Sequence, residues 1–394
     1  MQQSEASVLR DRRLYAVFSI TLIAVMGVAS ITPALPKMAA VLGLDKTHAA
    51  LLISAFTLPG VFLTPLAGIA ADRFGRKTVL IPSLLLFAVA GVSIFFLRNR
   101  AFRVILIFRV LQGSGAAALG ALNNTLIGDF FKGGRRSEAM GYNASFLSLA
   151  TALYPLVGGA LAGFAWFFPF LLPLLAVPAA IFIAVTVQEP DIHRAPGFSL
   201  YLKSIAQNIC RREAAGLFLI STITFTVLYG SFTTYNPFLL AQRFGLSSPQ
   251  IGFFISLSSV TTVLIAARTG RTAQRFGHIL PMKAGFVLYF VVNIWFASAG
   301  NLLSFAAAVL LFGAAQGLNL PNMHSAIADL APDAQRGAFM SLNGTMLRLG
   351  QTIGPLVVGF GDKLSGVWGA YGASAAISVI GFVILSTMLR PRKK

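Results

Sequence analysis

Three ionisable side chains stand inside long apolar stretches of this sequence: Arg109, His324 and Arg348. A buried cation is costly and usually faces a cavity or an anionic partner, whereas histidine titrates near neutral pH and can carry a proton. The 12 Asp and Glu residues lie between these stretches or at their ends, so we expect no carboxylate near their centres. The interior should therefore be electropositive and suit an anionic or neutral amphiphile better than a cation.

Each of these side chains also has a purely structural interpretation. Arg109 lies about 30 Å of helix from Asp129, so it could snorkel towards the nearer membrane surface. Arg348 could be held by Gln351 or by backbone carbonyls and fix helices together. His324 could be a hydrogen-bonded packing residue. The sequence leaves these alternatives open.

Other polar side chains in the apolar stretches could line the same path. They are Asn123, Asn124, Tyr142, Asn143, Tyr229, Tyr235, Asn322 and Gln351. Neither a Ser-His-Asp set on adjacent stretches nor a metal-ligand spacing or nucleotide-binding motif occurs. We therefore expect no enzyme, no bound metal and no cofactor.

Membrane-spanning helices must position these side chains. Hydrophobic residues make up 56% of the 394-residue chain and charged residues only 11%, and a spanning helix needs about 20 apolar residues. Only helices satisfy their own backbone hydrogen bonds in lipid, and barrel-like alternation is absent. We predict an all-α membrane protein with twelve spans, at 14–36, 48–71, 78–97, 103–128, 139–162, 164–187, 215–237, 249–269, 282–299, 302–328, 338–360 and 367–389.

The first six spans recur in the last six. Segment 68–76 is matched by 270–278, and Pro155 and Gly159 are matched by Pro355 and Gly359. Six spans return the chain to its starting side, so the halves should be parallel copies with a substrate site between them. The predicted units are an N-terminal six-helix bundle at 1–187, a cytoplasmic linker at 188–213 and a C-terminal six-helix bundle at 214–394.

The formal charge of +19 arises from basic residues that gather on one side of the predicted membrane. This positive-inside bias predicts cytoplasmic termini and a lipid rather than a nucleic-acid environment. The apolar run that follows Arg13 is too long for a signal-peptide core and is taken as the first span. The single cysteine, Cys210, rules out an intramolecular disulfide.

The loop after the second span carries the most specific motif. Segment 68–77 reads Gly-Ile-Ala-Ala-Asp-Arg-Phe-Gly-Arg-Lys, which resembles the loop 2–3 signature of the major facilitator superfamily. The resemblance implies that Asp72, Arg76 and Asp129 form a gating cluster that latches the outward-open state, with Gly68, Arg73 and Gly75 completing the motif. In the second copy Gln274 replaces the acid, so the resemblance implies a weaker second latch.

Two further segments resemble motifs of the same superfamily. Segment 108–115 resembles its span 4 motif, which implies a link between Arg109 and proton transfer. Span 5 is similar to the motif of drug antiporters, with Pro155, Gly158 and Gly159 in place but Ala150 and Tyr154 where glycines are usual. Its small residues should let spans 5 and 8 approach closely, and Pro155 should bend the helix.

The resemblance to the twelve-helix drug:proton antiporter branch implies a function. It implies a monomeric secondary active transporter in the cell (inner) membrane, which exports lipophilic drugs or amphiphiles by alternating access coupled to protons. The acid-free, arginine-bearing interior favours an alternative, a lipid or organic-anion transporter or flippase of the same fold.

Overall fold

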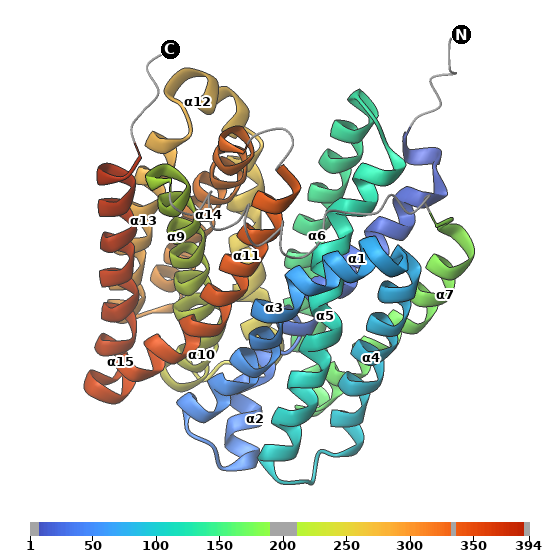
Figure 1. Ribbon diagram of the computed structural model, residues 1–394. Helices are drawn as coiled ribbons and strands as arrows, with labels where there is room; N and C mark the ends of the chain where they lie inside the picture. Colours follow the sequence, from blue (N-terminus) through green and yellow to red (C-terminus); the bar gives the residue numbers. More distant parts are fainter. Residues whose placement is uncertain (1–7, 190–210, 332–335, 390–394) are drawn as a thin grey trace.

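The computed structural model describes residues 8–189, 211–331 and 336–389, except for the side chains of Asn124 and residues 336–338. The predicted linker falls mostly on 190–210 and so lies outside the described residues. The described chain is almost entirely helical, as expected for segments that must satisfy their own backbone in lipid (Figure 1).

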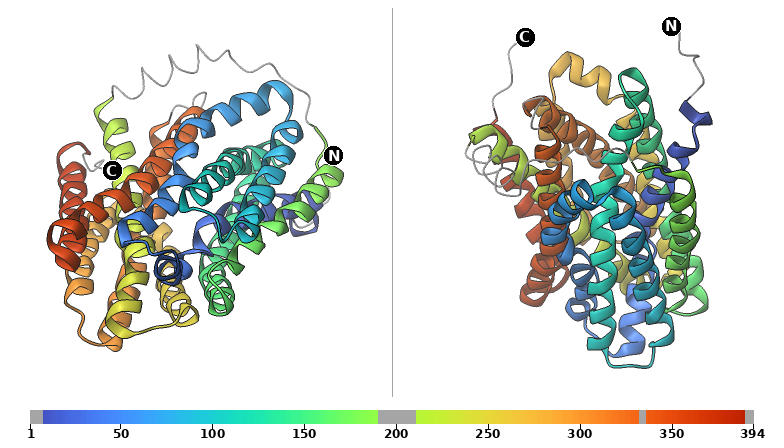
Figure 2. Two further views of the ribbon diagram at one scale, coloured as in Figure 1. Left: turned by 90° about the horizontal axis from the view of Figure 1, so that it is seen from below. Right: turned by 45° about the vertical axis from the view of Figure 1, so that its right-hand side comes forward.

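Helices α1 to α7 form one bundle and α9 to α15 the other (Figures 1 and 2). The first bundle, preceded by η1 (Val8–Arg10), comprises α1 (Arg12–Ala29), η2 (Thr32–Ala34), α2 (Leu35–Leu42), α3 (Lys46–Phe74), α4 (Arg76–Phe96), α5 (Phe102–Phe130), α6 (Gly134–Phe164), η3 (Phe168–Leu175) and α7 (Ala176–Thr186). The second comprises α9 (Arg212–Val227), η4 (Leu228–Tyr235), α10 (Asn236–Phe244), α11 (Ser248–Ala266), α12 (Thr269–Phe276), α13 (Ile279–Ser298), α14 (Leu302–Leu330) and α15 (Arg336–Thr387).

The predicted spans correspond to these helices. Eleven segments of the described chain are long and apolar enough to cross a membrane, and the last of them is two helices that meet at Ser365 and Gly366. Gly366 has φ +58°, a left-handed conformation that glycine adopts without steric cost. Counting α15 as two helices gives the twelve predicted spans.

Three spans are less regular than predicted, and the sixth of the chain begins with the 3-10 segment η3. The other two are the first and the seventh. The first is interrupted between α1 and α2, where Pro33 and Pro36 occupy the starts of new helical segments, because proline cannot continue the preceding hydrogen-bond ladder. The seventh widens into a π-helix at η4 before α10 begins. The irregular segments of the first and seventh spans lie where their bundle meets the other.

The face at which α1 begins and α15 ends is called the terminal face, and the other the opposite face. The bundles diverge towards the terminal face and converge at the opposite face, where α2 and α10 lie (Figure 1). Each bundle has its own apolar core, but Phe238 of α10 joins the core of the first bundle and Ala50 of α3 joins that of the second. The bundles are therefore packed together at the opposite face.

Candidate functional site

Two helix pairs make the most extensive contacts between the bundles, α6 with α11 and α3 with α15. The first pair, the glycine seam, brings backbone against backbone. A Cβ atom on Gly159 would lie 2.6 Å from the Ser248 carbonyl oxygen, and one on Gly252 would collide with the Pro155 carbonyl oxygen. The predicted close approach of spans 5 and 8 thus has a geometric basis at Gly159. Gly158 instead faces the Ser30 carbonyl within its own bundle.

The second pair, the polar seam, is lined by hydroxyl groups and charges. Ser54 donates to the Thr352 carbonyl at 2.9 Å, and the hydroxyl groups of Thr57 and Thr352 lie 2.9 Å apart. Towards the opposite face, Lys46 and Asp362 form an ion pair at 3.4 Å. These contacts join α3 of the first bundle to α15 of the second.

Arg348 lies on the polar seam about 18 Å along α15 from its first residue. A Cβ atom on Gly60 would lie 3.0 Å from Arg348 Cδ, and one on Gly120 would lie 3.4 Å from Arg348 Nη2. The two glycines thus leave room for the guanidinium against α3 and α5. Its Nη1 donates to Gln351 at 3.1 Å, and no carboxylate among the described residues pairs with it.

Arg109, in contrast, is enclosed by the first bundle and has no exposed surface. It donates to the Leu52 carbonyl at 3.1 Å and to Gln112 at 2.6 Å, and its guanidinium carbon lies 4.3 Å from the centre of the Phe56 ring. The alternative that Arg109 snorkels is therefore excluded in this conformation. The expectation that it makes an interior shared by the halves electropositive is wrong here, because its guanidinium lies inside the first bundle. A role for Arg109 in proton transfer stays a prediction.

The predicted path residues Asn123 and Asn143 are also engaged in hydrogen bonds inside the first bundle. Asn143 donates to Asn123 at 2.7 Å, Asn123 donates to Thr21 at 2.7 Å, and Thr21 donates to Asn143 at 2.5 Å. We call this closed ring, together with its counterpart between Ser221 and Asn343 at 2.6 Å, the polar clasps. Both asparagines of the first clasp are buried, so they fasten helices and do not line a path here.

The remaining predicted path residues are scattered. Tyr142 and Tyr229 are half-buried and pack against the core of the first bundle, and buried Tyr235 lies with Thr47 against Gly359. Tyr229 comes from the second bundle, so it reaches across the boundary. His324 is half-buried. The side chain of Asn124 lies outside the described residues.

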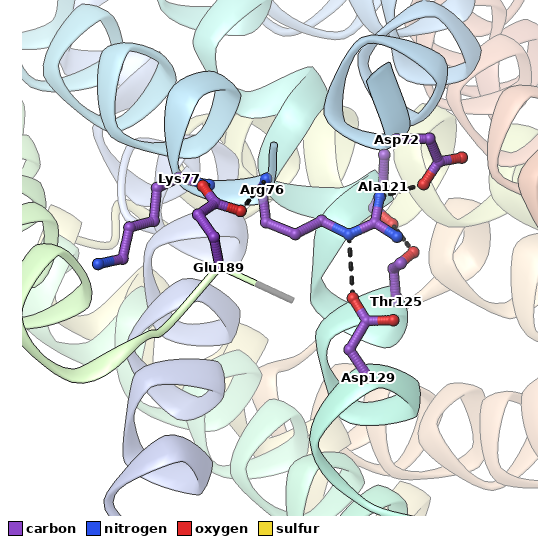
Figure 3. A network of polar contacts seen from close by, with 7 residues as sticks. All are labelled: Asp72, Arg76, Lys77, Ala121, Thr125, Asp129 and Glu189. Carbon is purple, nitrogen blue, oxygen red and sulfur yellow. Dashed lines mark hydrogen bonds and ion pairs between the residues drawn. The ribbon is translucent and has the colours of Figure 1, made fainter. Parts of the chain in front are cut away.

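The predicted gating cluster forms at the terminal face (Figure 3). Arg76, the first residue of α4, pairs with Asp72 at the end of α3 and, through Nε at 2.9 Å, with Asp129 on α5. The partners of these side chains among the described residues all belong to the first bundle, so the cluster bridges no seam in this conformation. Arg73 is exposed beside the Phe74 ring, and the surroundings of Gly68 are open.

Glu189 completes this cluster and was missed by sequence reasoning. Its carboxylate accepts the backbone N–H groups of Arg76 at 2.8 Å and Lys77 at 2.7 Å (Figure 3). An anion at a helix N-terminus satisfies free N–H groups and complements the helix dipole. Gly75, with φ +100°, leaves the space: a Cβ there would lie 2.9 Å from a Glu189 oxygen. An acid directly after span 6 was the available signal.

The second copy of the loop keeps a basic residue and an acid at corresponding places. His278 Nε2 lies 3.2 Å from Asp329, and its Nδ1 lies 3.0 Å from the Asn322 side-chain oxygen. Asn322 is therefore tied to the loop at the terminal face and does not face a central path. In the second copy Gln274 stands at the position of Asp72. This replacement gave no sign of the pair, because the acid of the pair, Asp329, belongs to α14.

The fold and the two seams define a multi-pass membrane protein built from two similar six-helix bundles that meet along paired helices. The Major Facilitator Superfamily profile matches residues 17–239 and 217–394, and the chain belongs to this family.

Relatives and solved structures extend this match. The chain is 25% identical to the bacillibactin exporter of Bacillus subtilis (strain 168), over 96% of each chain, and 26% identical to multidrug resistance protein 2 of the same organism, over 86% of this chain and 85% of that one. A crystal structure of a D-xylose-proton symporter has the same fold, with a TM-score of 0.79 at 15% identity, over 98% of this chain and 99% of that one. The family and these relatives indicate a transporter rather than an enzyme.

Proposed function

We propose that this protein is a monomeric secondary exporter of lipophilic or amphiphilic small molecules, driven by protons and working by alternating access. Its similarity to exporters along nearly the whole chain supports this. The proposed working parts are the two bundles (1–187 and 214–394), joined by the linker 188–213.

The observation that carries the proposal is the uneven contact between the bundles. The cross-bundle contacts run along α3 from Lys46 to Thr64, short of its terminal end at Phe74, and lie around Gly159 and Gly252 on the glycine seam. The gating cluster, at the terminal end of α3, has its partners in its own bundle. Such an arrangement suits one end state of a rocking cycle, in which the terminal side is open.

We infer that the terminal face is cytoplasmic in the cell (inner) membrane. Basic residues concentrate there, as in the loop after α3 (Arg73, Arg76, Lys77) and the loop after α5 (Lys132, Arg135, Arg136). Cytoplasmic loops of membrane proteins carry such an excess. In this orientation the conformation is open towards the cytoplasm, where an exporter collects its cargo.

A second candidate, a lipid or organic-anion transporter or flippase, rests on Arg348. Its guanidinium lies between the bundles with a neutral partner, Gln351, and without a described carboxylate. A cation in such a place attracts an anionic or polarisable head group. Tyr229, close enough for an electrostatic interaction with Arg348, stacks with Phe225 and offers an apolar surface beside it.

Transport into proteoliposomes under an imposed pH gradient tests both candidates. Dyes of matched size that are cationic, neutral or anionic should differ in rate, and Arg348→Gln should lower the preference for the anionic dye about tenfold, as expected for a lost hydrogen bond to a charge. Arg348→Lys should restore part of it, and Arg103→Gln at an exposed position should change nothing. Transport that ignores the gradient would remove proton coupling, and an unchanged dye preference in Arg348→Gln would remove the anion site.

A further inference from the structure

The ion pair between Lys46 and Asp362 joins the two bundles. The other ion pairs of the described residues, such as Arg76 with Asp129 and His278 with Asp329, each lie within one bundle. Lys46 is the first residue of α3, and Asp362 lies near the bend of α15. The pair therefore closes the polar seam at its end towards the opposite face.

A cavity of about 550 Å³ lies over this pair and is lined from both bundles. Asp45, Lys46, Asp362 and Lys363 contribute its charges, and Phe238 contributes an apolar wall. The side chains of Lys46 and Asp362 are 24% and 15% exposed, which leaves the carboxylate within reach of water. Protons can thus reach Asp362 while the seam is closed.

Apart from Lys363, the charged and titratable groups around Asp362 are engaged elsewhere or neutral. The Asp45 carboxylate accepts the His48 N–H at 2.6 Å and also lies 2.9 Å from the His48 ring. On α10, Arg243 donates to the Ala297 and Ala299 carbonyls.

Lys363 follows Asp362 on α15, lines the same cavity and is exposed. Tyr235 on η4 and Tyr371 on α15 act on Asp362 electrostatically, and a phenol is neutral at ordinary pH. Asp362 is thus the carboxylate whose charge decides whether Lys46 is held across the seam.

We propose that Asp362 is the proton-responsive residue of the gate on the opposite face. A proton taken up from that side neutralises the Asp362 carboxylate, and Lys46 is released to the water of the cavity. The polar seam then opens more readily, and loss of the proton restores the pair. This inference rests on the proposed alternating-access function and assigns proton sensitivity to a residue outside the centre of the membrane.

The test measures the distance across the gate and needs no substrate. In a Cys210→Ser background, Val41→Cys and Leu364→Cys place spin labels at exposed positions on the two bundles, for electron–electron distance measurement in lipid discs. The pH is lowered from about 8 to about 4, a range that includes carboxyl titration. The fraction of molecules with the longer distance between the labels should then rise about threefold, because a partly exposed ion pair contributes that much. Asp362→Asn should show the larger population at both pH values.

Matched variants separate the gate from general effects. Lys363→Gln removes a charge from the same cavity outside the pair and should leave the acid response intact. The exchange Lys46→Asp with Asp362→Lys should restore closure at high pH, which shows that a lost response in Asp362→Asn is not misfolding. An acid response that persists in Asp362→Asn overturns the proposal. Because transport is not measured, a protein that exports no drug could still pass this test, and an exporter could fail it.

Discussion

The glycine seam and the polar seam are related by the internal repeat, yet they are built from different chemistry. Gly159 approaches the Ser248 backbone in the first, whereas the second places Arg348, Thr352 and Asp362 on its α15 side. At the positions matching Arg348 and Asp362, α6 carries Ser148 and Ala162. The repeat thus supplies two equivalent contacts, and only one of them carries charge.

The difference indicates a division of labour. Backbone contact through glycines tolerates small rotations and presents no charge to be desolvated. Charges and hydroxyl groups in the polar seam change energy with ligand and proton binding. We therefore expect the glycine seam to act as the fulcrum and the polar seam as the side that responds.

The largest effect should come from filling the glycine seam. Gly252→Val places side-chain atoms against the Pro155 carbonyl, and overpacking of this kind destabilises by about 1–3 kcal/mol. Transport in proteoliposomes should fall more than about tenfold, with a lower midpoint of thermal unfolding in detergent. Gly141→Val on α6, where the surroundings are open, is the control; equal loss in both variants would end the fulcrum interpretation.

The next effect should come from the hydroxyl pair of the polar seam. Thr352→Val removes the contact with Thr57 between the bundles, and one buried hydrogen bond contributes about 1 kcal/mol. The ratio of open to closed gate, from spin-label distances, should rise about fivefold. Thr151→Val, at an exposed position of α6, should have no effect. A closed gate in Thr352→Val would show that apolar packing alone holds this seam.

A smaller effect is expected at the far end of α3. Asp72→Asn removes the carboxylate that pairs with Arg76, and because the Asp72 side chain is 35% exposed the change should be about threefold. It should lower the population closed at the terminal face, as seen by labels on the terminal ends of α3 and α15. Glu138→Gln, exposed on α6, is the control. If the closed population at the terminal face is unchanged in Asp72→Asn, the loop after α3 has no role in gating.

The smallest effect should distinguish the starts of the two seam helices. Asp45 caps the start of α3, and Ser247, which hydrogen-bonds with Gln250, caps the start of α11. A capping side chain contributes about 1 kcal/mol. The hydrogen bond from the His48 N–H holds the pKa of Asp45 below its ordinary 3.8. Its stabilisation is thus complete above that value and is lost as the pH falls through the lowered pKa.

Hydrogen exchange corrected for intrinsic rates checks this difference. Amides in the first turn of α3 should lose protection below about pH 4, whereas those of α11 should not, because a hydroxyl group does not titrate. Asp45→Asn should remove the pH dependence at α3 while Ser247→Ala leaves it. Equal acid responses at the two helices would show that the caps do not set them apart.

The spans could be predicted because hydropathy and backbone hydrogen bonding leave a membrane segment few alternatives. The sequence could not predict which side of each span faces the interior of its own bundle. In lipid both sides of a helix are apolar, so Arg109 and Asn143 have similar sequence surroundings to Arg348. Only the structure separates the enclosed guanidinium from the one on the seam.

The gating loop was predictable for a related reason. Segment 68–77 matches a specific family signature, and that resemblance implied the cluster of Asp72 and Arg76 that the structure shows. Glu189 lies more than a hundred residues away in sequence, and its contact with the Arg76 N–H depends on how α7 returns beside α4. Distant partners of this kind need the fold.

The polar clasps have a consequence for how the chain is made. In each bundle the first helix and the asparagine that it binds are 122 residues apart. An unpaired polar group in lipid is costly. The Asn143 side-chain oxygen should therefore gain its hydrogen bond only when α6 joins α1, and that of Asn343 only when α15 joins α9. Biosynthesis should then proceed in two separate closures, with the first bundle assembled in the membrane while the second is still leaving the ribosome.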